Sequence, residues 1–314
     1  MELIRAAGEL RTLTDGWRDG GSGVGLVTTM GALHDGHTSL IRRARQAHDR
    51  VVVTIFVNPL QFGADEDFDR YPRDEAADLR VCDRLGVDAV WAPPEDEVYP
   101  PGVELGSPDP GPIGRVLEGA ARPGHFAGVL KVVRRLFEVV GPCTTYFGQK
   151  DAQQLFLIRQ MVNQIDHLEV VVVDCPTVRD PDGLALSSRN ALLGSEEREQ
   201  AACLFLALTE AAELSRGGER DVGVLIAVMA REIGATPLAR LDYAAVVDEA
   251  TFEPVTTVVG PARALVAARF PSARLIDNLL LPVGSVRRAA QGARLSPPGA
   301  ASQDGPSFHP ETEG

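Results

Sequence analysis

The chain has 314 residues, of which 44% are hydrophobic and 24% are charged, and its formal net charge at pH 7 is −13. This length is enough for two domains of roughly 100–200 residues each. The acidic balance argues against a general nucleic-acid binder, which must neutralise phosphates. Because we find no signal peptide and no apolar run of about 20 residues, we also expect no membrane span and a cytoplasmic location.

Apolar, strand-like runs alternate with helical patterns in the first half of the chain. Strands are predicted at 24–28, 51–57, 89–92, 144–147 and 170–174, and helices at 38–48, 74–85, 125–140 and 151–164. Such alternation predicts a parallel sheet in an α/β fold.

The pattern changes after the loop at 176–183. Two helices are predicted at about 195–215 and 221–233, followed by strands at 241–247 and 262–270 and a possible third at 274–281. We expect a first domain at 1–176 and a smaller α+β domain at 177–284, which would close over a site as a lid hinged near 176–182. From Ser285 onward, proline, serine and glycine predict a disordered tail at 285–314.

The first predicted strand runs into Met30–His37, which reads MGALHDGH. The opening turn of a helix offers free N–H donors and a positive dipole end, and phosphate binds there readily. Gly31 and Gly36 let such a ligand approach the main chain. His34 and His37, three residues apart, can point to the same side and donate to adjacent phosphate oxygens.

Two other interpretations of this histidine pair stay open: two solvated loop residues, or half of a metal site. A zinc site is the weaker of the two, because catalytic zinc needs three protein ligands and the chain has no Cys-x-x-Cys or His-Glu-x-x-His spacing. The four cysteines are scattered, at Cys82, Cys143, Cys175 and Cys203.

A second polar group follows the second predicted strand, at Asn58 and Gln61. Side-chain amides both donate and accept hydrogen bonds, so they suit a ligand with hydroxyl and carboxylate groups. Both are equally compatible with a turn, and for Asn58, which precedes a proline, that alternative is strong.

A third group, at Gly148–Gln154, again joins a strand to a helix through glycine. Lys150 is a compact cation suited to a phosphate, whereas Asp151 either caps the helix or binds a ribose hydroxyl. Gln153 and Gln154 point in different directions on a helix, so at most one faces a ligand.

The fourth group is Ser187-Ser188-Arg189, which follows a turn-forming loop at 179–183. An arginine fork beside two hydroxyls binds phosphate well, although the same residues also suit the cap of a following helix. The first three groups all follow strands, and in open α/β sheets ligands bind at the carboxyl ends of the strands.

Taken together, these segments resemble the pantothenate synthetase family, the pantoate–β-alanine ligases of coenzyme A biosynthesis. The resemblance covers roughly residues 1–283 and rests on TMGALHDGH at 29–37, FVNPLQF at 56–62, RPGHFAGV at 122–129, FGQKD at 147–151 with Gln154, and GLALSSRN at 183–190. It implies a Rossmann-like doubly wound parallel sheet with a smaller C-terminal α+β domain, and a homodimer.

The resemblance also implies a reaction. ATP activates the carboxylate of pantoate, pyrophosphate leaves, and the amine of β-alanine attacks the acyl adenylate to give pantothenate and AMP, with Mg²⁺ as cofactor and no nucleic acid or membrane as partner. The residues carried over as catalytic are His34, His37, Lys150, Ser187, Ser188 and Arg189, with His37 as the proton donor to pyrophosphate. Gln61, Gln154 and Asn58 would bind pantoate, and Gln61 would also bind β-alanine. The implied ATP site consists of Met30, Gly31, Ala32, Leu33, His34, Asp35, Gly36, His37, Gly148, Gln149, Lys150, Asp151, Val178, Leu186, Ser187, Ser188 and Arg189.

Several positions depart from the family pattern. Thr28 replaces a proline, Gln149 a glutamate and Leu186 a methionine, whereas Asp35 and Thr38 replace glutamate and leucine. None of these changes removes a donor assigned above. Two alternatives remain: a related nucleotidyltransferase that acts on a phosphate ester, and a nucleotide-binding regulator that has lost catalysis.

Overall fold

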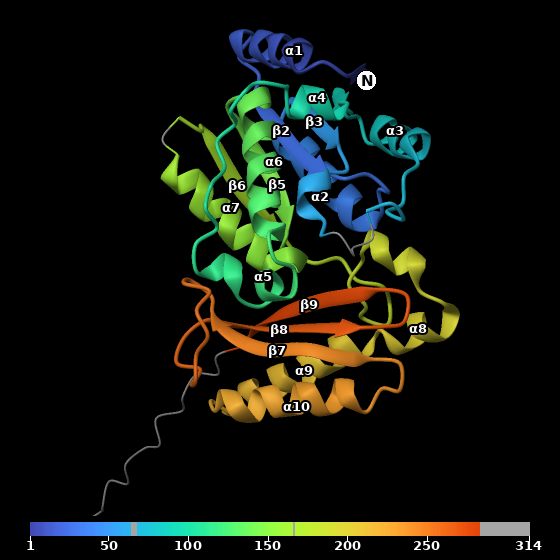
Figure 1. Ribbon diagram of the computed structural model, residues 1–314, viewed down its shortest axis with the longest axis vertical. Coiled ribbons are helices and arrows are strands. Elements are labelled where there is room, and N and C mark those ends of the chain that lie inside the picture. The colour runs from blue at the N-terminus through green and yellow to red at the C-terminus, as the bar shows by residue number, and fades with distance from the viewer. Residues whose placement is uncertain (64–67, 166, 283–314) are drawn as a thin grey trace, which may run out of the picture. The chain divides into compact units, whose positions relative to one another are not determined.

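A six-stranded parallel sheet forms the centre of the first 175 residues (Figure 1). The computed structural model describes residues 1–63, 68–165 and 167–282. The strand order is β1-β4-β3-β2-β5-β6, so the chain reverses direction across the sheet between β2 and β5. The strands are β1 (Glu2–Ile4), β2 (Val24–Thr29), β3 (Arg50–Ile55), β4 (Ala89–Trp91), β5 (Cys143–Gly148) and β6 (Val170–Cys175). In such sheets the reversal point opens the crevice that binds ligands.

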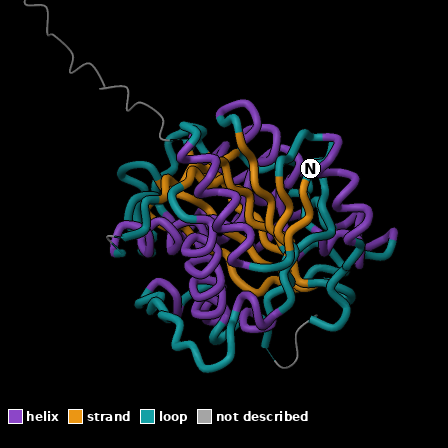
Figure 2. Tube along the Cα trace, turned by 90° about the horizontal axis from the view of Figure 1, so that it is seen from above, coloured by secondary structure: helices purple, strands orange, loops and turns teal. Residues whose placement is uncertain are grey.

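Helices cover both faces of this sheet, as Figure 2 shows from above. Leu26 and Val52 point into a core shared with helices on one face, whereas the neighbouring Val27 and Val53 point into a core on the other. This period-two alternation between two buried faces is why the strands are apolar at nearly every position. The first face carries α1 (Ala7–Asp19), α6 (His125–Val140) and α7 (Ala152–Gln164), and the second carries α2 (Asp35–Ala47) and α3 (Glu75–Arg84). Two short helices, α4 (Glu95–Val98) and α5 (Glu118–Ala121), lie in the connection between β4 and α6.

A second, antiparallel sheet follows, in the order β7-β8-β9. Its strands are β7 (Arg240–Asp248), β8 (Ala262–Arg269) and β9 (Arg274–Leu281), and the preceding helices are α8 (Ser195–Gln200), α9 (Cys203–Arg216) and α10 (Val222–Gly234). One face of the sheet packs on α9 and α10 through a core that includes Leu208, Leu225 and Val266. The other face places Leu265 against Ala152 at the start of α7.

The α/β fold with a parallel sheet and a smaller antiparallel sheet is confirmed, and the predicted strands and helices lie within three residues of their observed ends. One predicted helix is wrong in its continuity: the segment 195–215 is two helices, separated at Ala201 and Ala202. The carboxylate of Glu197 in α8 accepts bonds from the backbone N–H of Gly194 and of Ser272. The bond to Gly194 caps the start of α8, whereas the bond to Ser272 anchors α8 to the turn between β8 and β9, so α8 ends at Gln200 and does not run on into α9.

Residues 1–284 cluster as one unit, and the division at residue 176 stays a prediction. The predicted disordered tail at 285–314 lies outside the described residues. Within the described ranges, the structure has no helix that is both long and apolar enough to cross a membrane.

Candidate active site

A cavity of about 230 Å³ opens at the carboxyl ends of β2, β3 and β5, where the strand order reverses. Most of the residues singled out in the sequence line it: Met30, His34, Gly36, His37, Asn58, Gln61, Gly148, Lys150, Asp151, Gln154, Val178, Leu186, Ser187, Ser188 and Arg189. The other five predicted residues belong to the same turns but do not line the cavity: Gly31, Ala32, Leu33, Asp35 and Gln149. The four polar groups are therefore brought together at one site.

The turn after β2 is held by a residue that sequence reasoning missed. Asp78 of α3 is 3% exposed, and its carboxylate accepts from the backbone N–H of Ala32 at 2.9 Å and of Leu33 at 2.7 Å. Gly31 has φ +86° and Ala32 has φ +51°, a left-handed conformation that is strained for alanine. A Cβ at Gly31 would come within 2.9 Å of the Asp78 carboxylate, so glycine suits both the conformation and the contact.

We expect Asp78→Ala to weaken both folding and the affinity for ATP, the ligand that the sequence predicts. The change leaves two backbone N–H groups without their acceptor, at about 1–3 kcal/mol for each group that stays buried, and it frees the turn that leads into His34. Urea unfolding and ATP calorimetry measure the two effects, with the exposed Asp83 on the same helix as the matched Asp83→Ala control. Unchanged ATP affinity in a destabilised Asp78→Ala protein would limit Asp78 to a folding role.

His34 and His37 form the N-terminal cap of α2 with their own side chains. Nδ1 of His34 accepts from Gly36 N–H at 3.1 Å, and Nδ1 of His37 accepts from His34 N–H at 3.3 Å. Each neutral ring therefore carries its hydrogen on Nε2, which is left to donate. The ring centroids are 4.1 Å apart, so the two imidazoles form one donor pair on the cavity wall.

Burial, followed by the nearby His34 and Lys150, lowers the pKa of His37 from 6.5 to about 3. The neutral folded ring contributes stability that is fully present above pH 6.5 and is lost as the pH falls from 6.5 toward 3, because the unfolded chain binds the proton first. We therefore expect the NMR shift of the His37 ring proton in the ligand-free protein to stay flat between pH 5 and 8. A titration midpoint near 6.5 would contradict a ring that its surroundings keep neutral.

The amide of Gln61 is fixed by its neighbours at the second strand end. Asn58 donates to Gln61 Oε1 at 3.1 Å, and Gln61 Nε2 donates to the sulfur of Met30 at 3.0 Å, a weak acceptor. Asn58 also caps its own turn by accepting from Leu60 N–H at 3.2 Å. Asn58 is therefore a turn residue and also lines the cavity, where its amide orients the side chain of Gln61.

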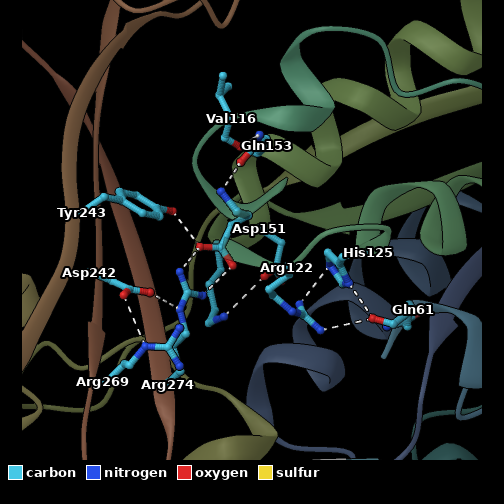
Figure 3. A network of polar contacts seen from close by, with 12 residues as sticks. Gln61, Val116, Arg122, His125, Asp151, Gln153, Asp242, Tyr243, Arg269 and Arg274 are labelled. Carbon is cyan, nitrogen blue, oxygen red and sulfur yellow. Dashed lines mark hydrogen bonds and ion pairs between the residues drawn. The ribbon is translucent and has the colours of Figure 1, made fainter. Parts of the chain in front are cut away.

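Arg122 and His125 support Gln61 from behind, in a stretch to which the sequence assigned no role. Nδ1 of His125 donates to the Gln61 carbonyl at 2.8 Å, and Arg122 donates to His125 Nε2 at 3.0 Å (Figure 3). Helix α6 approaches this turn closely at Gly128, where an added Cβ would lie 2.1 Å from the carbonyl oxygen of Leu60. A larger residue at that position would push the amide end of the cavity open.

Lys150 is the cation at the third strand end. Its side chain is 18% exposed and lies 3.5 Å from the Asp151 carboxylate. Burial acts to raise the pKa of Asp151, but Lys150, Arg189 and His125 outweigh it and lower the pKa overall. Asp151 occupies the N-cap position of α7 without making a side-chain capping bond, so the predicted capping role is wrong.

The two glutamines of α7 separate as predicted. Gln154 lines the cavity. Gln153 is 3% exposed and points away, accepting from Glu118 N–H at 3.1 Å and donating to the carbonyls of Ile113 and Val116. Only Gln154 is therefore available to a ligand.

The Ser187–Arg189 loop closes the remaining side. Ser187 caps the following 3-10 turn by accepting from Arg189 N–H at 3.3 Å. The N-cap of the helix that begins at Ser195 is Gly194, so the predicted cap of that helix by the Ser187–Arg189 group is wrong. Ser188 Oγ donates to the carbonyl of Ala32 at 3.4 Å, so the loop contacts the turn after β2. Val178 pairs with Leu186 through a backbone bond of 3.0 Å, which places both residues beside the serines.

The cavity wall carries two chemically different sets of side chains. N–H and hydroxyl donors occur together with the cations Lys150 and Arg189, although the whole chain is strongly acidic. The wall also holds the amides Gln61 and Gln154 and apolar side chains that include Phe56, Val132 and Val133. The first set suits a polyphosphate, and the second suits a small branched molecule with hydroxyl and carboxylate groups.

Comparisons with known proteins agree along nearly the whole chain. The model of the pantoate-beta-alanine ligase family matches residues 2–280. A pantothenate synthetase of Rubrobacter xylanophilus is 50% identical over 287 residues, which cover 89% of this chain and 98% of the relative. The crystal structure of pantothenate synthetase from Thermus thermophilus is 44% identical with a TM-score of 0.84, covering 90% of this chain and 99% of that one. A pantoate-beta-alanine ligase from Francisella tularensis, solved with beta-gamma ATP and beta-alanine, is 33% identical with a TM-score of 0.72, covering 89% and 97% of the two chains.

Proposed function

Because the chain belongs to the pantoate–β-alanine ligase family, we propose that its cavity divides into an ATP end and a pantoate end. The enzyme condenses pantoate with β-alanine, converting ATP to AMP and pyrophosphate through a pantoyl adenylate. The observation that supports this division is the contrast within the cavity wall between the donors suited to phosphate and the amides and apolar side chains.

The first step joins the two ends. A carboxylate oxygen of pantoate attacks the α-phosphorus, a C–O–P linkage forms, and the bond to the bridging oxygen breaks as pyrophosphate leaves with the electron pair. The Nε2–H groups of His34 and His37 and the ammonium of Lys150 stabilise the charge that grows on the phosphate oxygens. Because Nδ1 of each imidazole accepts a backbone N–H bond and the pKa of His37 is lowered, we assign both rings hydrogen-bond donation, a narrower role than the proton donation that the family resemblance implies for His37.

The second step transfers the acyl group to nitrogen. The neutral amine of β-alanine attacks the carbonyl carbon of the adenylate, a C–N bond forms, and AMP leaves with the electrons of the C–O bond while the amine releases a proton to solvent. No covalent bond to the protein is required. The work of the side chains is therefore positioning and exclusion of water, with Gln61 beside the amine and the Ser187–Arg189 loop over the phosphates.

Mg²⁺ fits this donor set. Asp151 is the one carboxylate among the described residues of the cavity wall, and protein-bound Mg²⁺ commonly uses one or two carboxylates together with substrate phosphates and water. We therefore assign Asp151 as the protein side chain that would hold the ion beside ATP. When bound, the ion would neutralise charge on the phosphate oxygens.

At the pantoate end, Gln61→Ala should raise the KM for pantoate by about tenfold, the effect of losing roughly 1.4 kcal/mol of hydrogen bonding. The KM for ATP should stay unchanged, because Gln61 lies at the amide end of the cavity. Steady-state kinetics with each substrate varied in turn measure both values. The exposed Gln160 on α7 provides the Gln160→Ala control, and an unchanged pantoate KM in Gln61→Ala would remove Gln61 from the substrate site.

Three further assignments belong to this proposal. We propose that residues 1–176 bind the nucleotide and pantoate, and that residues 177–284 act as a lid. The enzyme would work in the cytoplasm as a homodimer. The edge strand β6 supports pairing, because Val171 is 61% exposed on a strand with a neighbour on one side in the described sheet.

A pyrophosphate-release assay tests the function directly. The protein is incubated with ATP and magnesium, with pantoate alone, with β-alanine alone and with both, and AMP and pantothenate are identified by mass. Pyrophosphate release that requires pantoate and is completed by β-alanine is the expected result. Release only with a phosphorylated acceptor would indicate a nucleotidyltransferase, and ATP binding without turnover would indicate a regulator.

A further inference from the structure

Asn278 on β9 reaches across from the second sheet to the turn that carries Lys150. Its side-chain Nδ2 donates to the carbonyl of Lys150 at 2.7 Å and to the carbonyl of Gln149 at 3.0 Å. These two carbonyls belong to residues 128 and 129 positions earlier in the chain. Asn278 is 4% exposed, so water does not take over these bonds.

The amide of Asn278 is itself held in one orientation. Arg263 on β8 donates to its Oδ1 at 2.6 Å, and Arg263 is in turn bound through two nitrogens by Glu249, at 2.6 and 2.8 Å. The acceptor and both donors of the amide are therefore used, which removes the freedom of the group to flip.

The preceding residue, Asp277, makes a second contact, with the turn that leads into the Ser187–Arg189 loop. Asp277 is 3% exposed and binds Arg179 through both of its oxygens, one of them at 2.9 Å from Nη2. Arg179 also donates to the carbonyl of Gly183 at 3.0 Å, which ties the 179–183 turn that precedes Ser187–Arg189 to the same strand. Two adjacent residues thus hold the turn that carries Lys150 and the turn that leads into Ser187–Arg189.

A second bridge on β9 keeps this strand against the first sheet. Arg274 donates through two nitrogens to the Glu118 carboxylate, at 2.7 Å each, and Tyr243 donates to the same carboxylate at 2.9 Å. In Figure 3, Tyr243 and Arg274 lie on the same side of Asp151, and Asp242 joins Arg274 to Arg269. The anchor is independent of Asn278, so loss of the amide leaves β9 in place.

We propose that Asn278 is a positioning residue for Lys150, and that the Asp277-Asn278 pair sets the Lys150 turn and the Ser187–Arg189 loop at the separation that the reaction needs. The proposal rests on the function given above. It adds that the second sheet fixes the geometry of the phosphate end through backbone carbonyls, without contributing a side chain to the substrates.

The test is Asn278→Asp, which preserves size and the acceptor for Arg263 but replaces the donor with a second oxygen facing two carbonyls. We expect kcat to fall by about tenfold to a hundredfold, the range that a displacement of about 1 Å produces, while the KM for pantoate changes less than threefold. Combined with Lys150→Ala, the same substitution should lower kcat by less than a further threefold, because its effect is transmitted through Lys150.

Leu275→Ala is the control for general destabilisation. Leu275 is on the same strand, 5% exposed in the core under α9 and α10, and has no bond to the Lys150 turn. Its melting temperature should fall at least as far as that of Asn278→Asp, with kcat within threefold of the parent.

Three results would overturn the proposal: a parent-like kcat in Asn278→Asp, equal kcat losses in Leu275→Ala and Asn278→Asp, or a double variant with Lys150→Ala in which the two kcat losses multiply fully.

If Asn278→Asp does not fold, Asn278→Ser is used, which keeps a smaller donor and should retain more of kcat than Asn278→Ala. Absence of activity in the parent protein would refute the function itself, whereas calorimetric ATP binding by each variant still reports whether the phosphate end is disturbed.

Discussion

Lys150→Ala is expected to lower kcat by about 10²–10³, the effect of removing one preorganised charge from a transition state. Lys150 is the one lysine among the described residues of the cavity wall and is 18% exposed. Its ammonium is therefore partly withdrawn from water, where a charge acts more strongly on developing phosphate charge. Single-turnover pyrophosphate release measures the loss at the chemical step.

The chain provides a matched control. It has two lysines, and the other, Lys131, lies over the ring of Tyr99 at 5.7 Å from the centroid, away from the cavity wall. Lys131→Ala should keep kcat within about threefold, since it removes a cation–π contact of modest strength. Near-normal turnover in Lys150→Ala would refute its assignment at the phosphate.

His37→Ala is expected to cost a similar factor, about 10²–10³ in kcat, through the loss of one Nε2–H donor. The informative comparison is His37→Gln, whose amide N–H reaches about as far as Nε2 but does not exchange a proton near neutral pH. If the ring acts as a neutral hydrogen-bond donor, His37→Gln should recover at least tenfold over His37→Ala in the same assay.

Equal losses in His37→Gln and His37→Ala would favour proton transfer by the ring over hydrogen-bond donation. The exposed His167 serves as the control, and His167→Ala should match the parent. A parent-like rate in His37→Ala itself would place the histidine pair outside the chemistry.

The strands and the four polar groups were predictable because their signals are local. An apolar run followed by glycine and donors, as at 24–37 and 143–151, identifies a strand end and its ligand-facing turn without knowledge of distant residues. The separation of Gln153 from Gln154 follows equally from helix geometry, since adjacent residues point in different directions.

The supporting residues were not predictable, because nothing near them in the sequence reveals their partners. Asp78 reads as one of several acidic residues in an amphipathic helix, and its two N–H donors lie 45 and 46 positions earlier. Asn278 looks like an ordinary polar residue of a strand, and the two carbonyls to which it donates are more than 120 positions away. Such contacts depend on how the two sheets pack, which periodicity does not encode.

Helix α1 and strand β1 were not predicted from the sequence, because their local signals are weak. Helix α1 buries only Leu10 and Thr14 among its described residues, and it contains two glycines, Gly8 and Gly16. Glycine lowers helix propensity by about 1 kcal/mol per residue. Helix α1 therefore forms because it packs against the rest of the protein, and its own sequence does not predict it. Strand β1 has three residues and gives too short a run for a period of two to be recognised.

Because the chain has two lysines and one of them lines the cavity, nucleotide binding can be measured by chemical labelling of amines. An amine-selective reagent meets two side chains in this chain besides the amino terminus, and Lys131, which lies outside the cavity, acts as an internal reference for Lys150. If Lys150 lies at the phosphate end as proposed, the ratio of the two labelled peptides in a mass spectrum reports how much of that end is covered by a bound nucleotide. A binding curve becomes measurable without turnover, coupling enzymes or an engineered probe.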